Sequence, residues 1–275
     1  MFAYFSRLAC SLAALGVFLA ACATVPGTGR KQLSLVSDRD LSTMAAQQYS
    51  QMVRKGPLSD SQKDTAMIKK VGAGISRAAE TFLREQGRAS EIAGYRWEFN
   101  LIEADEVNAF CMPGGKVAFY TGILPYTKGE AGVAVVMGHE VAHAIAHHSR
   151  ERASQELLAN IGENILDIGM RMRGESALTY QMAMSAYGLG SQVGVLLPFS
   201  RAHESEADRI GLTLMALAGY DPAEAVAFWR RMSEKTGGAS GPAFLSTHPS
   251  DKSRVAYIEE YLPEARARYQ AARKK

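Results

Sequence analysis

The sequence predicts a helix-rich α+β domain with one small β-sheet. Apolar residues recur at helical spacing through most of the chain beyond residue 37, and one short segment, 95–103, alternates apolar and polar residues as a half-buried strand does. Pro- and Gly-containing turns separate these segments. With 275 residues, 47% hydrophobic and 21% charged, the composition is that of an ordinary globular protein with room for one sizeable domain or two small ones.

The first 21 residues differ from the rest. Arg7 supplies a positive charge, and the following run to Ala21 is uncharged over about 14 residues, which is shorter than the roughly 20 that a membrane-spanning helix needs. We therefore interpret 1–21 as a secretory signal. Its end, Leu-Ala-Ala-Cys22, resembles a bacterial lipobox, in which the Cys becomes the lipid-modified first residue of the mature chain. An uncleaved anchor, or a signal cut elsewhere, is the alternative.

This interpretation divides the chain into the signal, a lipidated tether at 22–36 and a folded domain at 37–275. Ala23, not Asp, follows Cys22, which by resemblance to bacterial lipoproteins favours the outer membrane. Processing leaves Cys111 as the one other thiol, so we expect no intramolecular disulfide. The net charge of +3 is too small to indicate nucleic-acid binding.

Two segments are expected to form strands, at 95–103 and at 116–121. Pro113-Gly114-Gly115 precedes the second, so residues 107–121 are expected to form a β-hairpin. Helices are expected at 37–55, 60–86, 130–150, 153–173, 201–218, 222–235 and 251–271. Inside the third of these helices, Gly138 costs about 1 kcal/mol relative to Ala. A small residue there would let another backbone approach closely.

The segment 176–197 is apolar and contains Gly, Ser and Met. We expect it to be a buried helix. A mobile lid over a cleft and a membrane-facing patch are the alternatives.

The sequence HEVAH at 139–143 has the chemistry of a zinc site. Residues four apart lie on one face of a helix, so the imidazoles of His139 and His143 can reach one ion. Glu140 would lie beside that ion and accept a proton from water that the metal acidifies. The spacing therefore predicts one catalytic zinc per chain, with Glu140 as the base that takes a proton from its water.

A catalytic zinc usually has a third protein ligand. His147 continues the four-residue repeat, but on an unbroken helix each imidazole is displaced by about 6 Å along the axis, so three cannot converge on one ion. We therefore expect His147 and His148 to be structural or to support the ligands. Glu204 and Asp208 share one helix face, which suggests a ligand and a partner for a ligand imidazole. By spacing alone, a solvated acidic helix is equally consistent.

The two motifs HExxH and SRxxExxAD together resemble the HtpX and CAAX-prenyl-protease family of gluzincin metallopeptidases. Asn108-Ala-Phe-Cys-Met-Pro-Gly-Gly-Lys116, Tyr120-Thr-Gly122 and Leu245-Ser-Thr-His-Pro249 also look like segments of that family. The resemblance implies a zincin-like fold with an active-site HExxH helix. It also implies Glu204 as the third zinc ligand and Asp208 as a proton donor or a support for the site. The lipobox makes the chain look like the BepA/LoiP-like lipoprotein branch.

Two further site predictions follow. Residues 107–112 are expected to form an edge strand to which an extended peptide adds, with Asn108, Ala109 and Phe110 against the substrate. Cys111 is expected to pack there as a small buried hydrophobe. His248 is a candidate for stabilising the oxyanion, and in the resembling lipoproteins the equivalent residue closes the open position on zinc. A surface histidine near a helix start is the third interpretation of His248.

The expected role is quality control of unfolded or misassembled envelope proteins by a protease anchored to the outer membrane and facing the periplasm. Its partners would be polypeptide substrates, the inner leaflet of that membrane through the lipid on Cys22, and possible outer-membrane assembly machinery. A chaperone-like assembly factor with latent proteolysis is the main alternative, and a purely structural zinc site is another.

Overall fold

The computed structural model describes residues 22–192, 197–234, 243–248 and 252–274. The expected signal at 1–21 lies outside the described residues, as do Pro249 and Ser250. The chain forms two compact units. The larger unit comprises Asp38–Ser149 and Phe199–Lys275, and the smaller comprises Met1–Ser37 and Arg150–Pro198.

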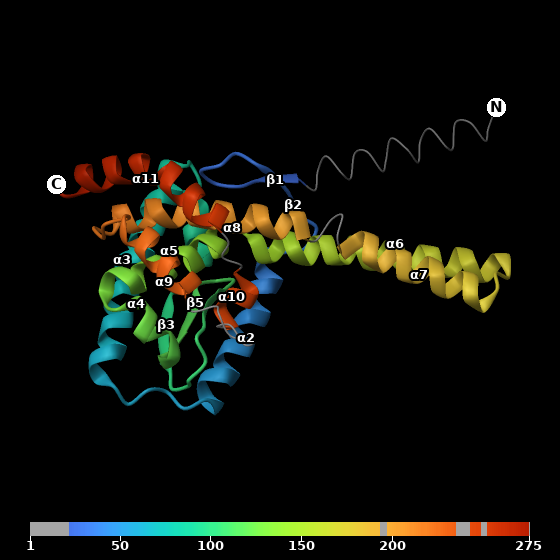
Figure 1. Ribbon diagram of the computed structural model, residues 1–275, viewed down its shortest axis with the longest axis horizontal. Helices are drawn as coiled ribbons and strands as arrows, with labels where there is room; N and C mark the ends of the chain where they lie inside the picture. The colour runs from blue at the N-terminus through green and yellow to red at the C-terminus, as the bar shows by residue number, and fades with distance from the viewer. Residues whose placement is uncertain (1–21, 193–196, 235–242, 249–251, 275) are drawn as a thin grey trace. The chain divides into compact units, whose positions relative to one another are not determined.

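A three-stranded sheet lies at the centre of the larger unit (Figure 1). Its strands are β3 (Glu98–Ile102), β4 (Ala109–Met112) and β5 (Lys116–Tyr120), in the order β3-β5-β4. β5 pairs parallel with β3 and antiparallel with β4, with Cys111 opposite Val117. The predicted strands and the predicted hairpin are therefore confirmed, and β4 is an edge strand of this sheet.

Helices cover both faces of the sheet (Figure 1). On one face, α2 (Asp38–Lys55) places Tyr49 against Ile102 and Ala118. The Tyr49 hydroxyl donates to the Val117 carbonyl oxygen at 2.5 Å. On the other face, α3 (Gln62–Glu85) packs on β3, where Gly72 admits the ring of Phe99: a Cβ at Gly72 would lie 2.4 Å from that ring.

The central helix α5 (Glu130–Ile145) packs against α3, β4 and α9, and every residue from Gly132 to Ile145 is buried. Its run of Val, Ala, Met and Ile is apolar on all sides, as suits a helix enclosed by other elements. α8 (Leu197–Leu217) crosses α5 at Gly138. The other elements of the unit are η1 (Ala89–Gly94), η2 (Thr121–Ile123), α4 (Leu124–Thr127), α9 (Glu224–Glu234), α10 (Ala243–Thr247) and α11 (Lys252–Ala272).

The helix expected over 130–150 is broken. α5 ends at Ile145, His147 takes the left-handed conformation with φ +57°, and α6 begins at His148. Left-handed backbone is uncommon for residues other than Gly, but His is among those that tolerate it. The expectation of an unbroken helix is therefore wrong at its last turn, although the HEVAH segment lies entirely within α5.

The smaller unit contains a β-hairpin and a helical hairpin. Strand β1 (Cys22–Thr24) pairs antiparallel with β2 (Lys31–Leu33), so the segment expected as a tether contains regular structure. α6 (His148–Arg173) and α7 (Ala177–Ser191) are antiparallel and joined by a short turn. Within the described residues, no helix has the length and apolar content needed to cross a bilayer.

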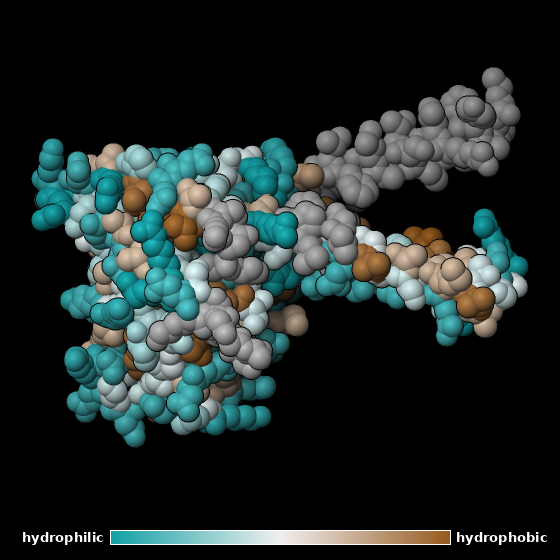
Figure 2. Space-filling model, in the orientation of Figure 1, coloured by the Kyte–Doolittle hydropathy of each residue, from teal (hydrophilic) through white to brown (hydrophobic). Residues whose placement is uncertain are grey.

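The segment 176–197 is not a buried helix over its described part. None of the residues of α7, all of which are described, is buried. The helix forms because Ser176 caps it, accepting a hydrogen bond from the Thr179 backbone N–H. The described part of the chain therefore does not bury its apolar side chains (Figure 2).

Candidate active site

His139 and His143 project from the same face of α5, one turn apart. Their Nε2 atoms lie 3.1 Å from each other, and both side chains are almost wholly enclosed. Two imidazole nitrogens this close together in a buried site could both bind the same cation. The four-residue spacing brings them together on one face of the helix.

Glu204 reaches this position from α8. Its carboxylate lies 3.2 Å from Nε2 of His139 and 3.3 Å from Nε2 of His143. Burial would raise the pKa of Glu204, but the adjacent histidines lower it below its usual value, so the group is a carboxylate in the folded chain. The structure thus brings together the three residues that the sequence assigned to a metal, although their coordination of an ion stays a prediction.

His248 completes the cluster from the end of α10. Its Nδ1 lies 3.0 Å from a Glu204 oxygen and 3.1 Å from Nε2 of His139. The candidate ligand atoms of these three residues and His143 all lie within 4.8 Å of one another. His248 therefore belongs to the site, and its interpretation as a surface histidine is wrong.

The backbone before His248 also contacts the loop that leads into β4. The Phe244 N–H donates to the carbonyl oxygen of Val107, the first residue of the segment 107–112 expected to receive a substrate, at 2.9 Å. The Phe244 ring, fully buried, lies 4.7 Å from the His248 imidazole. The Phe244–Val107 hydrogen bond ties the segment 243–248, which carries His248, to the loop before β4.

Asp208 supports His139 from the side away from the cluster. Its Oδ1 accepts a hydrogen bond from Nδ1 of His139 at 2.9 Å, which leaves Nε2 free to bind a cation. Burial would raise the pKa of Asp208, but Arg254 and His139 outweigh it and lower that pKa. Asp208 is therefore an anion that fixes the orientation of an imidazole ring.

Arg254 was missed by sequence reasoning. Its guanidinium donates to both oxygens of Asp208 at 2.8 Å, and it lies 3.2 Å from a Glu204 oxygen. The same group stacks on the Trp229 ring at 3.5 Å from the centroid. Arg254 is one of several charged residues in α11, and no local pattern distinguishes it from the exposed ones.

Glu140 lies beside the cluster and is buried. Burial raises the pKa of its carboxyl, against the opposing effect of His248 and His139. One oxygen accepts from the Cys111 backbone N–H, while Oε1 has no hydrogen-bond partner among the described residues. Nε2 of His248 lies 3.4 Å from that oxygen. A buried carboxylate oxygen left open toward the cluster suits a group that receives a proton from water.

The two histidines after the HEVAH segment do not enter the cluster. His147 bridges Asp38 at 3.1 Å and Glu91 at 3.0 Å, so it ties α2 to η1. His148 approaches the other nitrogen of His143, with Nδ1 of each ring 2.8 Å apart, and it contacts Glu206 at 3.2 Å. The turn at His147 directs its side chain away from the site. This turn, and not displacement along an unbroken helix axis as expected from the sequence, keeps His147 out of the cluster.

The edge strand β4 passes directly over Glu140. Its outward N–H groups are occupied, because Ala109 donates to the Asn108 side chain at 2.9 Å and Cys111 donates to Glu140. Phe110 points to the opposite face, toward α2. The Cys111 thiol is buried, and burial raises its pKa, which makes it a packing group and not a nucleophile.

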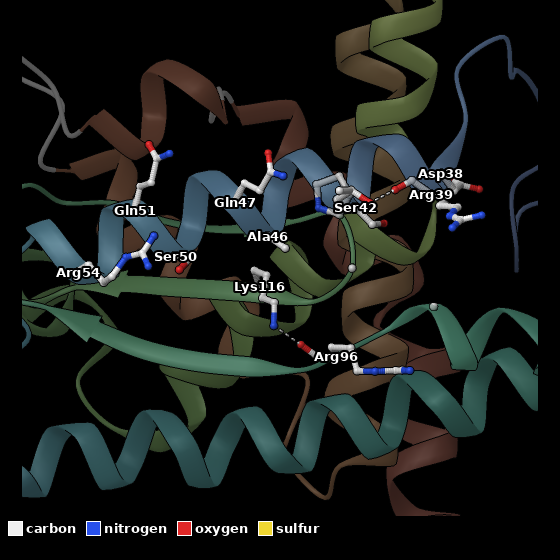
Figure 3. A pocket seen from close by; sticks show the side chains of 14 residues that line it. Asp38, Arg39, Ser42, Ala46, Gln47, Ser50, Gln51, Arg54, Arg96 and Lys116 are labelled. Atoms are coloured by element: carbon white, nitrogen blue, oxygen red, sulfur yellow. Dashed lines mark hydrogen bonds between the residues drawn. The ribbon is translucent and has the colours of Figure 1, made fainter.

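A groove of about 850 Å³ lies elsewhere in the larger unit, along α2 (Figure 3). Its other wall includes Arg96 and Lys116, and Lys116 donates to the Arg96 carbonyl oxygen at 2.9 Å. None of the cluster residues lines it. The histidine cluster is therefore identified by its chemistry and not by the size of a cavity.

The donor set fits zinc. Imidazole nitrogen and carboxylate oxygen are its usual ligands, and a catalytic site combines three of them with one further position. His139, His143 and Glu204 supply the three, and His248 occupies the neighbourhood of the fourth. An ion bound there would add positive charge beside the buried Glu204 carboxylate.

Comparison with known sequences gives an independent finding. Residues 73–262 match the family described as Peptidase family M48. This range contains the sheet, α5, α8 and every residue of the cluster.

Three curated relatives illustrate the match. Mitochondrial metalloendopeptidase OMA1 of Schizosaccharomyces pombe is 39% identical over 202 residues, covering 70% of this chain and 54% of its own length. The protein of the same name from Arabidopsis thaliana is 38% identical, covering 68% of this chain and 36% of its own. The Beta-barrel assembly-enhancing protease of Escherichia coli K12 is 31% identical over 58% of this chain and 33% of its own. The chain thus spans about half or less of these relatives.

Proposed function

The chain belongs to peptidase family M48, and on that basis we propose that it is a zinc-dependent endopeptidase that cleaves extended segments of polypeptides. The observation that carries the proposal is the convergence of His139, His143 and Glu204 beside the buried carboxylate of Glu140. The two histidines and Glu140 come from α5 and Glu204 comes from α8, so the site exists only in the folded chain.

In this mechanism His139, His143 and Glu204 would hold the ion. Zinc supplies Lewis-acid polarisation of the scissile carbonyl and of the attacking water. Glu140 accepts the proton of that water on Oε1 and returns it to the leaving amine. The raised pKa of Glu140 suits both steps, because a weakly acidic carboxyl accepts a proton readily at neutral pH.

The neighbouring charges prepare the site before substrate binds. Asp208 fixes the ring of His139, and Arg254 fixes Asp208 through two hydrogen bonds. Arg254 also stacks on Trp229 of α9. Trp229 therefore helps to fix Arg254, which fixes Asp208 and through it the ring of His139. We assign Asp208 and Arg254 positioning roles, and Arg254 a contribution to balancing the charge of Glu204.

The substrate binds as an additional strand along β4. Asn108, Ala109 and Phe110 lie at or next to that edge, and backbone hydrogen bonding places few demands on the substrate sequence. The N–H groups of Ala109 and Cys111 already have side-chain partners, so a bound peptide would use the edge carbonyls or displace those side chains.

We further propose that His248 gates the site. Its imidazole occupies the ligand cluster, and the Phe244 N–H bond to Val107 holds the segment 243–248 beside the edge strand. Substrate entry would break the Phe244–Val107 hydrogen bond and at the same time withdraw the His248 imidazole from the cluster. Once withdrawn, His248 could face the substrate carbonyl, which keeps oxyanion stabilisation as the competing role.

The finer biological role is also a proposal. The lipobox ending at Cys22 supports anchoring at the bacterial outer membrane, facing the periplasm, and the exposed Cys22 side chain is accessible to such modification. The relative named for β-barrel assembly supports a role in quality control of envelope proteins, whereas the two OMA1 proteins are named as mitochondrial. Labelling with radioactive palmitate in a bacterial host, lost in Cys22→Ser, tests the anchor; equal labelling of both would disprove it.

Cleavage of casein tests the enzymatic proposal. We expect activity in the wild type, loss with a chelator and recovery with zinc. Glu140→Gln should reduce the rate by at least about 10²-fold while retaining zinc, because only the proton acceptor is removed. Zinc bound without hydrolysis or hydroxamate inhibition would indicate a structural site. If Glu140→Gln supported every cellular role, a chaperone-like assembly factor would be the better description.

A further inference from the structure

Two buried polar side chains extend from the ring nitrogen of His143 that does not belong to the ligand cluster. Nδ1 of His148 lies 2.8 Å from Nδ1 of His143, and Nε2 of His148 lies 3.2 Å from a Glu206 oxygen. His148 is 1% exposed and Glu206 is 6% exposed. Polar groups enclosed to this degree are held by hydrogen bonds. The contacts therefore form a continuous chain from a carboxylate of α8 to a candidate zinc ligand.

The break between α5 and α6 brings His148 to this position. At about 100° per residue, a residue five positions after His143 on an unbroken helix would point about 140° away from it. Instead α5 ends at Ile145, His147 takes a left-handed φ of +57°, and α6 begins at His148. The rings of His143 and His148 then meet edge to face, with their centroids 4.9 Å apart. The unusual backbone angle at His147 thus has a consequence at the site.

Glu206 reaches His148 from the helix that also supplies Glu204. Residues two apart on a helix point about 160° away from each other, so the two carboxylates face different neighbours. Glu204 contacts Nε2 of His143, whereas Glu206 contacts the ring that lies at Nδ1 of His143. His203 stacks on the ring of His148, with their centroids 4.3 Å apart and their planes 14° apart. This stack and the two hydrogen bonds together fix the orientation of His148.

The chemistry of metal binding decides where the protons lie along this chain. An imidazole that binds a cation through Nε2 uses the lone pair of that nitrogen, so its proton is on Nδ1. The Nδ1–H of His143 then donates to Nδ1 of His148, and the proton of His148 is on Nε2, from which it donates to Glu206. The opposite direction of donation would place a proton on Nε2 of His143 and prevent it from binding a metal.

We propose that His148 and Glu206 are positioning residues that hold the ring of His143 in the tautomer that binds zinc. The inference rests on the proposed zinc site and deepens it. Asp208 serves His139 in the same sense, because it accepts directly from Nδ1 of that ring. The two histidine ligands of α5 are thus oriented by different acceptors: a carboxylate for His139, and a second imidazole backed by a carboxylate for His143.

Zinc affinity, measured by competition with a chromophoric chelator, tests the hydrogen bonds. His148→Phe keeps a flat ring but cannot accept from His143, so zinc affinity should fall by about 10- to 100-fold. His148→Gln should recover most of that loss, because its amide contains both an acceptor and a donor. Glu206→Gln keeps the shape of the side chain and loses its charge, and should weaken zinc binding by about tenfold.

Tyr95→Phe is the matched control. The buried Tyr95 hydroxyl donates to the carbonyl oxygen of Ala144, the residue next to His143 on α5, at 3.2 Å. This variant also loses one buried hydrogen bond beside His143, but that bond does not contact the imidazole. Zinc affinity should therefore be unchanged in Tyr95→Phe.

Nitrogen NMR spectroscopy of the unsubstituted, zinc-loaded protein with isotope-labelled histidine determines the proton positions without any substitution. We expect one zinc-bound ring with its proton on Nδ1, and a second ring with its proton on Nε2. A scalar coupling between the two Nδ1 nuclei should report the hydrogen bond that joins His143 to His148. That coupling should be absent from His148→Gln, which also assigns the signals.

The outcomes separate this inference from the proposed function. If the unsubstituted protein bound no zinc, the proposed function would fail and the inference with it. If that protein bound zinc and His148→Phe bound it equally well, the inference alone would fail. Equal losses in Tyr95→Phe and His148→Phe, an equal loss in His148→Gln, or a zinc-loaded protein without the coupling would also overturn it.

Discussion

Gly138 of α5 and Gly211 of α8 meet where the two helices cross. A Cβ placed on Gly138 would lie 3.0 Å from the Gly211 carbonyl oxygen, and one placed on Gly211 would lie 3.1 Å from the backbone of Gly138. Gly138 directly precedes His139, and Gly211 lies two turns beyond Glu204. The absence of two side chains therefore sets the separation of the helices that carry the candidate zinc ligands.

Gly138→Ala is expected to push α5 and α8 apart. The contacting atoms are backbone and cannot rotate away, so the free energy of unfolding should fall by about 1–3 kcal/mol and zinc affinity should fall with it. Chemical denaturation and a competitive zinc titration measure the two effects. Gly169→Ala, in α6 with open space around it, should instead stabilise by up to about 1 kcal/mol. Unchanged zinc affinity in Gly138→Ala would contradict the assigned role of the crossing.

Asp208→Asn is expected to weaken zinc binding by about 10- to 100-fold. The amide keeps the size of the side chain but loses the charge that orients His139 and pairs with Arg254. Asp167→Asn removes a carboxylate that pairs with Arg171 in the other compact unit and should leave zinc affinity unchanged. If both variants bound zinc like the wild type, Asp208 would have no positioning role.

Arg254→Lys tests whether two hydrogen bonds to Asp208 are required. A lysine keeps one positive charge but cannot donate in the planar, two-point geometry of a guanidinium. We expect zinc affinity to fall by about tenfold and kcat to fall more than KM rises, since the ligand and not the substrate is disturbed. Arg268→Lys, whose ion pair with Glu85 is exposed, is the matched control. A rise confined to KM would instead place Arg254 against the substrate.

His248→Ala is expected to raise the rate of casein cleavage. If the closed state is favoured by about 1.4 kcal/mol, removing the imidazole should raise kcat/KM by about tenfold. A fall of about 10²- to 10³-fold would show that His248 stabilises the oxyanion. An unchanged rate would exclude both roles. The zinc content of the variant should be measured in parallel, so that loss of the ion is not mistaken for loss of catalysis.

His147→Ala is expected to retain zinc and cleavage. Its contacts are to Asp38 and Glu91, so the change should cost stability by roughly 1 kcal/mol, an amount limited by the exposure of both carboxylates. His143→Ala should lose zinc outright. The contrast between two histidines four residues apart separates the ligand from the structural residue, and loss of zinc in both variants would return His147 to the ligand set.

Local sequence determined much of this protein. His139 and His143 lie one helical turn apart, and so do Glu204 and Asp208. Helix geometry places residues at this spacing on one face, so the sequence alone shows that each pair can act together. Alternation of apolar and polar residues likewise identified β3, and Pro113-Gly114-Gly115 identified the hairpin that contains β5. Gly138, a small residue inside an apolar helix, likewise indicated the close approach of another backbone.

Tertiary structure alone decided the remaining features. The turn at His147 depends on one unusual backbone angle. The Phe244 contact with Val107 and the Arg254 contact with Asp208 join segments that are distant in sequence. The exposure of α7 is decided in the same way, because an apolar helix is buried only if the fold provides a surface to cover it. Helical periodicity acts over a few residues, whereas burial and long-range hydrogen bonds depend on where the whole chain places its elements.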